Sequence, residues 1–476
     1  MAETFLHGVE VLDIDSGARP VATVATSVIG IVGTAPDADA TVFPLDTPVL
    51  IAGSRATAAK LDMTGDGLGT LPDALDSILD QAGAVVVVIR VEKETTDAAT
   101  LANVLGGTDA NTGQRLGVHA LLSAKSTLGV QPRILIAPGF THQRTANGIL
   151  TIAKNNAGAG YTNGTHALVF TGGSGTGAAG TAVVSGGAVT SVSLTASGQD
   201  YTSNPTVTLA STAGAGTTTA TFTITRGTVG NSIVAELIGI ADQLRAVIFA
   251  DGPGTNDAAA VAYAGDFGSK RVYLIDPPVL KTGSDGLTMQ SYASAGAAGI
   301  QARIDNELGF WWSPSNQLFN GITGTSRAID FALGDSASRA NLLNEAKVAT
   351  IIREDGFRLW GNRTLSSDSK WAFLCVVRTA DIINDSLQAA HLWAVDRGIT
   401  KQYIAEVTES VNAYLRHLVS IGAILGGSCW VDPDLNTSDQ IAQGKVYFDF
   451  DFTPAYPAEH VTLRSHLVQD YIKEIF

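Results

Sequence analysis

Cysteine is scarce in this chain of 476 residues, and no apolar run is long enough to cross a bilayer. The longest such run, residues 82–89, is under half of the about 20 residues that a transmembrane helix needs. Residues 1–15 contain acidic groups and no basic region, so we expect no signal peptide. The two cysteines, Cys375 and Cys429, lie in the apolar or tight segments WAFLCVV and GGSCWV. This placement favours two reduced thiols in a protein that folds in a cytoplasm.

Basic residues are also few. The chain has 30 Lys and Arg against 45 Asp and Glu, which gives a formal net charge of −15. Contacts to phosphates need a basic surface, so this charge argues against unaided binding of nucleic acid. The length exceeds what one compact core uses and predicts two or three domains. A hydrophobic fraction of 45% with 51 glycines indicates a globular and partly β-rich protein.

Catalytic motifs are missing as well. The sequence contains no G-x-S-x-G, no H-E-x-x-H and no Walker-type G-x-x-x-x-G-K-[ST]. One G-x-G-x-x-G occurs at Gly175, Gly177 and Gly180, but β-type sequence follows it where a dinucleotide fingerprint requires a helix. The eight histidines are scattered singly, with no pair at metal-ligand spacing. We therefore expect no catalytic residue, no cofactor and no metal site.

The stretch DMTGDGLGTLPD, residues 62–73, partly matches a calcium-binding loop. Gly69 lies where an apolar residue normally anchors such loops, and the last ligand is Asp73 instead of Glu. The alternative is a Gly-rich turn followed by a helix, with Thr70 as its N-cap and Pro72 in its first turn. We favour this structural interpretation.

The charged and aromatic stretch IIREDGFRLWGNRTLSSD spans residues 351–368. One possibility is an anion site in an enzyme, formed by Arg353, Asp355, Arg358 and Arg363 with Trp360. No nucleophile or base accompanies the arginines, so we favour a β-rich corner with buried ion pairs and with Asn362 holding a turn.

Buried apolar runs alternate with helical patterns through most of the chain. Runs such as VVVVI are what a mostly parallel sheet covered on both faces requires, so this region is α/β. We expect strands in SVIGIVGTAP, PVLIAG, AVVVVIRV, RILIAPG, AVIFADG and RVYLIDP, and helices over about 72–81, 233–244 and 257–267. The first 20 residues alternate only weakly and predict an extended arm.

A segment of different composition interrupts this pattern. From about residue 155 to 228 the chain is rich in Gly, Ser, Thr, Ala and Val, and only Asp200 and Arg226 are charged. It repeats at a period of 40, since GYTNGTHALVF at Gly160 returns as DYTSNPTVTLA at Asp200. Short Thr/Val strands with Gly-rich turns predict a small β-module inserted as a unit. Disorder is the alternative, but a polar linker would not need apolar residues at alternate positions.

The cleanest alternation lies near the end of the chain, in GKVYFDFDFTP, residues 444–454. Apolar and polar side chains point to opposite faces of such a strand, and the apolar set is Val446, Phe448, Phe450 and Phe452. GSCWVD, residues 427–432, could turn back through a polar loop and pair with it as a hairpin. A two-stranded hairpin is marginal alone, and added strands would satisfy the hydrogen bonds of its edges.

Six stretches resemble contractile phage tail sheath proteins of the P2-like and R-type-pyocin-like kind. They are HGVEVLDIDSGARP, TSVIGIVGTAPDADATVFPLDTPVLI, WWSPSNQLFNGITG, LLNEAKVATIIREDGFRLWGNRTLSSD, HLWAVDRGIT and GKVYFDFDFTPAYPAEHVTLR. They are spread over about 400 residues in family order. The inserted β-module is the departure, because the smaller members that resemble this chain lack it.

The resemblance implies an α/β fold class. An α/β sheath core domain would carry the inserted all-β module, and an α+β C-terminal domain would hold a short sheet that arms of neighbouring subunits complete. The expected divisions are an N-terminal exchange arm at 1–22, an outer α/β domain at 23–154 and 229–335, an outward-facing module at 155–228, an inner C-terminal domain at 336–458 and a C-terminal exchange arm at 459–476. The expected exchange residues are Val9, Val11 and Ile14 in one arm, Val446, Phe448, Phe450 and Phe452 in a resident strand over 445–452, and Val461, Leu463 and Leu467 in the other arm.

The resemblance also implies a function without catalysis. Hexameric rings of subunits would stack helically around a tail tube in a metastable extended state. A baseplate signal would trigger contraction, which drives the tube through the host envelope with no nucleotide consumed. Partners would be other copies of the chain, the tail tube protein, and baseplate and tail terminator proteins, with no nucleic acid and no membrane insertion. The location would be the virion tail, after assembly in the host cytoplasm.

Two residues are candidates for the contact with the tube. Arg397 and Lys401 lie in DRGITK, which joins two helices of the inner domain. Two other function classes stay open at this point: an α/β enzyme, and a sheath subunit whose β-module also binds surface glycans.

Overall fold

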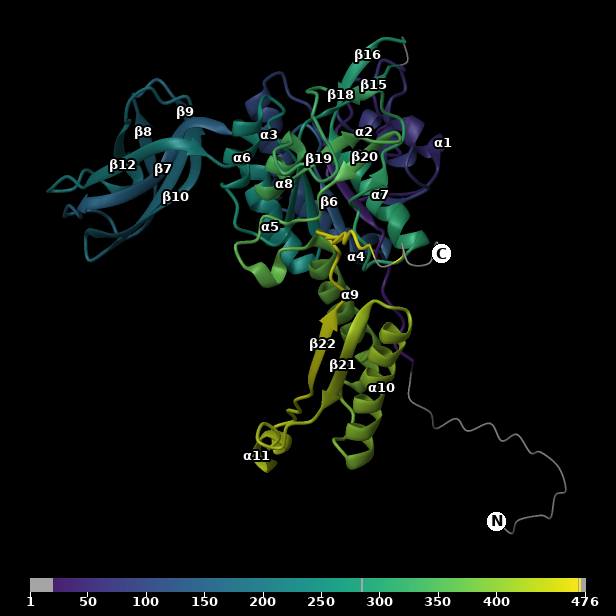
Figure 1. Cartoon of the computed structure of the whole chain (residues 1–476). Helices are drawn as coiled ribbons and strands as arrows, with labels where there is room; N and C mark the ends of the chain where they lie inside the picture. Colours follow the sequence, from purple (N-terminus) through teal and green to yellow (C-terminus); the bar gives the residue numbers. More distant parts are fainter. Residues whose placement is uncertain (1–19, 284–285, 470, 472–476) are drawn as a thin grey trace. The chain divides into compact units, whose positions relative to one another are not determined.

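The computed structural model describes residues 20–283, 286–469 and 471, which form two compact units (Figure 1). We call residues 23–310 and 314–385 the α/β unit. The smaller unit includes residues 386–469, and we call it the C-terminal unit. None of the helices in this part of the chain is long and apolar enough to span a membrane.

A nine-stranded sheet forms the centre of the α/β unit, in the order β17-β20-β19-β14-β13-β6-β1-β3-β2. The strands from β19 to β3 run parallel, and β2, β20 and β17 add antiparallel edges. Their bounds are β1 Ile29–Thr34, β2 Val49–Ala52, β3 Val85–Val91, β6 Ile134–Ile136, β13 Val247–Asp251, β14 Val272–Ile275, β17 Gln317–Leu318, β19 Val348–Arg353 and β20 Phe357–Trp360. The chain turns from one side of β1 to the other between β3 and β6, which makes the sheet doubly wound.

Helices cover both faces of this sheet (Figure 1). Alternate residues of the buried strands serve the two layers: Ile29, Ile31, Val86 and Val88 pack on one side, and Val32, Val87 and Ile89 on the other. The first layer holds α2 Leu71–Leu79 and α7 Ala293–Glu307, and the second holds α3 Asp97–Leu105, α5 Ser232–Leu244, α6 Asp257–Ala264 and α8 Arg339–Glu345. The expected strands and helices of the α/β pattern are thereby confirmed.

Smaller elements complete the unit. They are α1 Arg55–Ala58, α4 Ala124–Leu128, the 3-10 turns Ala59–Leu61, Gly117–Ser123 and Ser369–Trp371, the pair β4 Gly107–Thr108 and β5 Arg115–Leu116, and the three-stranded sheet of β15 Val279–Thr282, β16 Thr288–Ser291 and β18 Gly324–Thr325. Helix α9, Leu374–Ala390, begins in the α/β unit and ends in the C-terminal unit.

Residues 336–385 differ from the expected domain division. Strands β19 and β20 join the nine-stranded sheet, so this segment belongs to the α/β unit and not with the residues that follow. The reason is pairing: Leu274 and Ile275 of β14 lie in register with Val348 and Ala349 of β19. The 351–368 stretch is β-rich, as expected. The ion pairs expected there are wrong for Arg358, whose guanidinium donates to the carbonyl oxygens of Glu354 and Asn316.

The inserted module is built of antiparallel strands. β7 Thr145–Asn156 pairs with β12 Thr221–Val229, and a four-stranded sheet has the order β10-β9-β8-β11. The latter strands are β8 Gly164–Thr171, β9 Thr176–Ser185, β10 Ala188–Gln199 and β11 Thr206–Leu209. The limits expected at 155 and 228 fall inside β7 and β12, because both strands extend to the register pair Thr145 and Val229. The GTGAAG glycines lie at the start of β9 and not at a helix.

The loop before α2 forms a turn. The Asp62 carboxylate accepts hydrogen bonds from the backbone N–H groups of Gly65 and Gly67, each at 2.8 Å. Thr70 is the N-cap residue, as predicted, but its hydroxyl makes no capping bond. It accepts a bond of 3.2 Å from the Thr34 N–H at the end of β1, so it ties the helix to the sheet.

Asp251 at the end of β13 caps helix α7 from outside that helix. Its carboxylate accepts bonds from the Ser294 N–H at 2.8 Å and the Ser294 hydroxyl at 2.6 Å. Burial raises the pKa of Asp251 to about 6, although the bonds from Ser294 lower it. A carboxyl group whose pKa is higher in the folded than in the unfolded chain binds more protons in the folded state at any pH between the two pKa values. Stability should therefore fall as pH rises from 3.8 to about 6, and stay level above.

We expect Asp251→Asn to flatten this pH dependence. An amide keeps an acceptor for the Ser294 N–H but does not titrate, so a loss on the order of 3 kcal/mol between pH 4 and 7 should disappear. Urea unfolding of the isolated chain at several pH values measures it. An unchanged slope in the variant would show that another group titrates in that window.

Candidate assembly interface

The predicted hairpin of the C-terminal unit is confirmed. β21 Ile424–Trp430 pairs antiparallel with β22 Asp449–Pro454, with Cys429 opposite Phe450 and Gly427 opposite Phe452. β21 lies against helix α10, Lys401–Ser420. α11, Ser438–Ala442, lies in the connection between the strands, and the 3-10 turn Leu392–Ala394 precedes α10.

β22 begins four residues later than the predicted strand over 445–452. Asn436 is the reason: its side chain donates to the Tyr447 carbonyl at 2.9 Å and accepts from the Tyr447 N–H at 2.8 Å. One amide side chain thus takes both backbone groups that a strand partner would use. Val446 and Phe448 therefore precede the strand, although Phe448 still lies near the Tyr403 ring, with centroids 6.4 Å apart.

The apolar face of β22 points toward α10. A Cβ atom at Gly427, opposite Phe452, would lie 3.4 Å from the Leu415 side chain of that helix. This face is only partly covered, since Phe450 stands at the margin of a two-stranded sheet and remains 37% exposed. Its ring stacks on Phe452 at 6.2 Å.

We expect Phe450→Asp to destabilise the isolated chain by about 1 to 2 kcal/mol, because part of an aromatic side chain leaves an apolar contact. Asp449→Asn, on the opposite face of the same strand, is the matched control and should change stability by less. Urea unfolding separates the two. Equal effects would show that the faces of β22 are assigned wrongly.

The two outer edges of the hairpin are not equivalent. Asn412 of α10 donates to the Cys429 carbonyl at 3.1 Å and accepts from the Cys429 N–H at 2.8 Å. Both backbone groups of a residue point to one side of an antiparallel strand, so Asn412 occupies the outer edge of β21 at this point. Phe450 is opposite Cys429, and its backbone groups therefore point to the outer edge of β22. In the described part of the chain no third strand joins this sheet.

Of the arm residues expected to exchange strands, the structure describes those of the C-terminal arm only. Val9, Val11 and Ile14 lie outside the described residues. Val461, Leu463 and Leu467 belong to no helix or strand, and their side chains are 70%, 91% and 100% exposed. The chain therefore does not bury these three apolar side chains.

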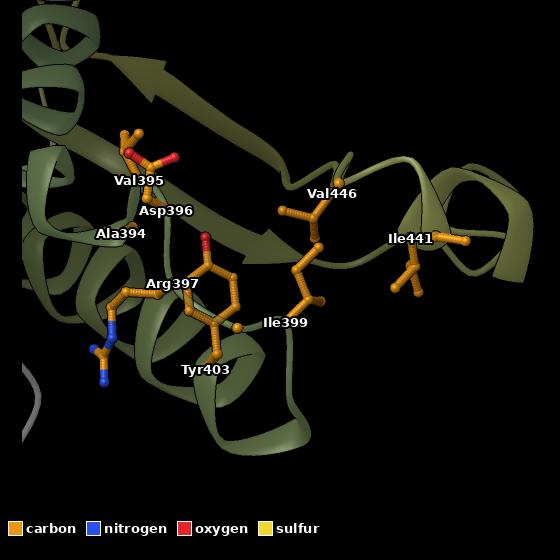
Figure 2. A pocket seen from close by; sticks show the side chains of 11 residues that line it. Ala394, Val395, Asp396, Arg397, Ile399, Tyr403, Ile441 and Val446 are labelled. Carbon is orange, nitrogen blue, oxygen red and sulfur yellow. The ribbon is translucent and has the colours of Figure 1, made fainter.

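Arg397 and Lys401 lie before and at the start of α10, as predicted for a loop that joins two helices. Arg397 is engaged: it lies 5.0 Å from the Trp393 ring centroid and pairs with Glu406 at 3.4 Å. Arg397 lines an open groove of about 690 Å³. Figure 2 shows other side chains that line it, namely Val395, Ile399, Tyr403, Ile441 and Val446. Lys401 is exposed and follows the N-cap Thr400, so it is the more available cation of the two.

The two thiols are poorly suited to nucleophilic chemistry. Burial, followed by the charge of Asp449, raises the pKa of Cys429 to about 11. Burial also raises the pKa of Cys375. Both side chains are unpaired and buried, and a thiol with a raised pKa stays protonated at neutral pH.

The crevice where enzymes of this topology bind ligands is filled by the chain itself. That crevice lies outside the carboxyl ends of β1 and β6, where the strand order reverses. A Cβ atom at Gly69 would lie 2.3 Å from the Thr34 carbonyl oxygen, and one at Gly139 would lie 2.9 Å from the Thr70 side chain and 3.3 Å from the Tyr292 ring. Among the residues that the structure describes, no group of three His, Cys, Asp or Glu side chains could hold a metal ion.

Three family models match the chain. A phage tail sheath C-terminal domain matches residues 366–467, a phage tail sheath protein central domain matches 219–365, and the tail sheath protein Gp18 domain III N-terminal region matches 26–91. These three ranges include the C-terminal hairpin, helix α9 and every strand of the central sheet except β6.

Curated relatives match over nearly the whole length. A prophage major tail sheath protein of Pseudomonas aeruginosa (strain UCBPP-PA14) is 38% identical over 475 residues, which is 99% of each chain. The tail sheath protein of Escherichia phage P2 is 33% identical, over 98% of this chain and 97% of its own. Among solved structures, the helical sheath of the anti-feeding prophage in its contracted state matches with a TM-score of 0.58 at 18% identity, over 98% of this chain and all of the other.

Proposed function

The chain belongs to the phage tail sheath family, and from this premise we propose that it polymerises helically around a tail tube by exchanging β-strands between subunits. As a contractile tail sheath subunit it has a structural role and a tail-associated location. We propose further that the sheath assembles in a metastable extended state and that its contraction drives the tube through the host envelope.

The single observation that carries strand exchange is the free edge of β22. Phe450 and Phe452 present backbone groups there without a partner strand, next to an apolar face that the subunit covers only in part. An exposed strand edge of this kind is a site for β-augmentation. The exposed Val461, Leu463 and Leu467 offer the apolar side chains that an added strand from another copy would bring.

Imaging tests the proposal directly. Negative-stain electron microscopy of concentrated protein should show tubes, because each subunit both offers an edge and supplies an arm. Dispersed particles at every concentration and ionic strength would count against polymerisation.

Lys401 is our proposed contact to the tube, with Arg397 as a weaker candidate because Glu406 already neutralises it. Contacts to the tube must break during contraction. Pairs of exposed charges suit such a contact, because each contributes only about 0 to 1 kcal/mol of binding free energy. We propose the tail tube protein and the baseplate and tail terminator proteins as partners, with the subunits arranged in hexameric rings.

The β-module is proposed to face outward. The paired strands β7 and β12 bring its two ends to the same register position, Thr145 and Val229, so it leaves and re-enters the unit at one place. A bulky module could not fit between a sheath and its tube. Of its four aromatic side chains, Tyr161 and Tyr201 are buried, and Phe170 and Phe222 are partly buried against the same core.

We expect replacement of residues 146–228 by a short Gly/Ser linker to preserve folding, polymerisation and contraction. Insert length changes loop-closure entropy slowly, by about 0.6 kcal/mol per doubling, so the parent fold does not depend on the insert. Electron microscopy should show tubes with thinner outer ridges. A folded variant that forms no tubes would place the module in a subunit interface.

A further inference from the structure

Helix α9 carries three charged side chains on one face. Arg378, Asp381 and Asp385 are spaced by three and four residues, which puts them in one stripe along the helix. Their side chains are only 3%, 10% and 12% exposed. A stripe of buried charge on a connecting helix needs an explanation beyond packing, because each charge has lost most of its water.

The partners of this stripe stand in a row at the amino edge of the sheet. Arg133 directly precedes β6, Arg271 directly precedes β14, and Arg245 lies two residues before β13. Since β14, β13 and β6 are parallel neighbours, the three arginines lie side by side. Asp385 pairs with Arg133 and, at 3.2 Å, with Arg245, while Asp381 pairs with Arg271.

In the remaining ion pair the helix supplies the cation. Arg378 of α9 donates to both carboxylate oxygens of Asp305 in α7, at 2.7 and 2.5 Å. It also donates to the Thr26 carbonyl oxygen at 3.1 Å. From the N-terminal to the C-terminal end of the stripe, the charges on α9 are therefore cation, anion and anion. The charges that face them on the α/β unit are anion, cation and cation.

This order of charges opposes sliding of the helix by one turn in either direction. Movement toward the C-terminus of α9 would bring Arg378 over Arg271, and movement the other way would bring Asp381 over Asp305. Both shifts place like charges together in a buried contact. A contact made only of apolar side chains would lose little free energy in the same shift. Such one-turn shifts are how packed helices switch in other proteins.

We propose that this ladder of ion pairs is a shear lock, which makes α9 and the α/β unit one body while the sheath is under load. The proposal rests on the proposed contraction, since contraction supplies the load. The division between the two units falls directly after Asp385, five residues before α9 ends. We therefore expect residues 378–385 to keep their shape during contraction, and the segment from Asp385 to Lys401 to change.

Hydrogen exchange of extended and contracted sheaths made of the unmodified chain tests the location. Amides of residues 378–385 should keep their protection to within about twofold on contraction, while those of residues 391–400 change by about tenfold or more. Loss of protection in 378–385 on contraction would overturn the lock.

A charge swap tests the mechanism. The double variant Arg378→Asp with Asp305→Arg keeps an ion pair but leaves α9 with three anions over three cations, so a one-turn shift no longer meets like charges. We expect the variant subunit to fold and assemble, and its 378–385 amides to exchange at least about tenfold faster than those of the unmodified chain in contracted sheaths. Unchanged protection in the swapped sheath would show that charge order does not hold the register.

The two proposals fail in different ways. A chain that forms no sheaths at all would overturn the proposed function, and the lock with it. Sheaths that form and contract while 378–385 loses protection would overturn the lock alone. If the swapped chain does not fold, the exchange measurement on the unmodified chain still decides where the change of shape occurs.

Discussion

A chain without residues 1–17 should fold and yet form no long sheaths. Every strand of the nine-stranded sheet lies beyond residue 28, so the deletion leaves that sheet complete. Each hairpin of β21 and β22 would lose the strand that we propose another subunit donates. Two-stranded sheets are marginal alone, and a polymer linked by them fails when the linking strand is missing. The expected result is native circular dichroism with only short or no tubes in electron micrographs.

Two comparisons sharpen this result. Replacement of residues 1–17 by a Gly/Ser segment of equal length should fail in the same way, because it lacks the apolar side chains of Val9, Val11 and Ile14. A chain with Val9→Asp alone should form tubes that are shorter than normal. Tubes of normal length from the truncated chain would contradict strand exchange by the N-terminal arm.

The arrangement of the central sheet could be predicted from sequence because buried parallel strands are almost purely apolar. Val86 to Ile89 are buried on both faces, and runs of this kind have no other common explanation. The hairpin was predictable for the opposite reason: regular alternation in Phe450 and Phe452 marks a strand with one apolar face. Where burial alone decides which residue types a segment contains, the spacing of its apolar residues predicts its structure.

The start of β22 and the blocked edge of β21 were not predictable in this way. Both depend on single asparagines, Asn436 and Asn412, whose side chains replace a strand partner for Tyr447 and Cys429. Asparagine in a polar loop or on a helix is common, and nothing in its neighbours shows which backbone group it will meet. These contacts arise from the tertiary fold.

The ion-pair ladder left a signal that the sequence interpretation missed. An arginine stands just before each of three buried runs, in PRILIA, LRAVIF and KRVYLI. Strands that are parallel neighbours align such positions at one edge, so three arginines at equivalent places predict a cationic row. Their acidic partners on α9 lie more than 100 residues away along the chain, and only the position of that helix reveals them.

Removal of a buried carboxylate should lower the free energy of unfolding far more than removal of an exposed one. Asp305 is fully buried beneath Arg378, whereas Asp242 is 60% exposed and pairs with Arg271 at 2.8 Å. We expect Asp305→Ala to lower the free energy of unfolding by about 3 to 5 kcal/mol, because it leaves the Arg378 guanidinium buried without its counter-charge. Asp242→Ala should cost about 0 to 1 kcal/mol, since solvent already screens that pair and Arg271 keeps Asp381. Urea unfolding of the two isolated variants gives the difference. Equal costs would mean that α9 is held by its apolar contacts and that the buried charges contribute little to its position.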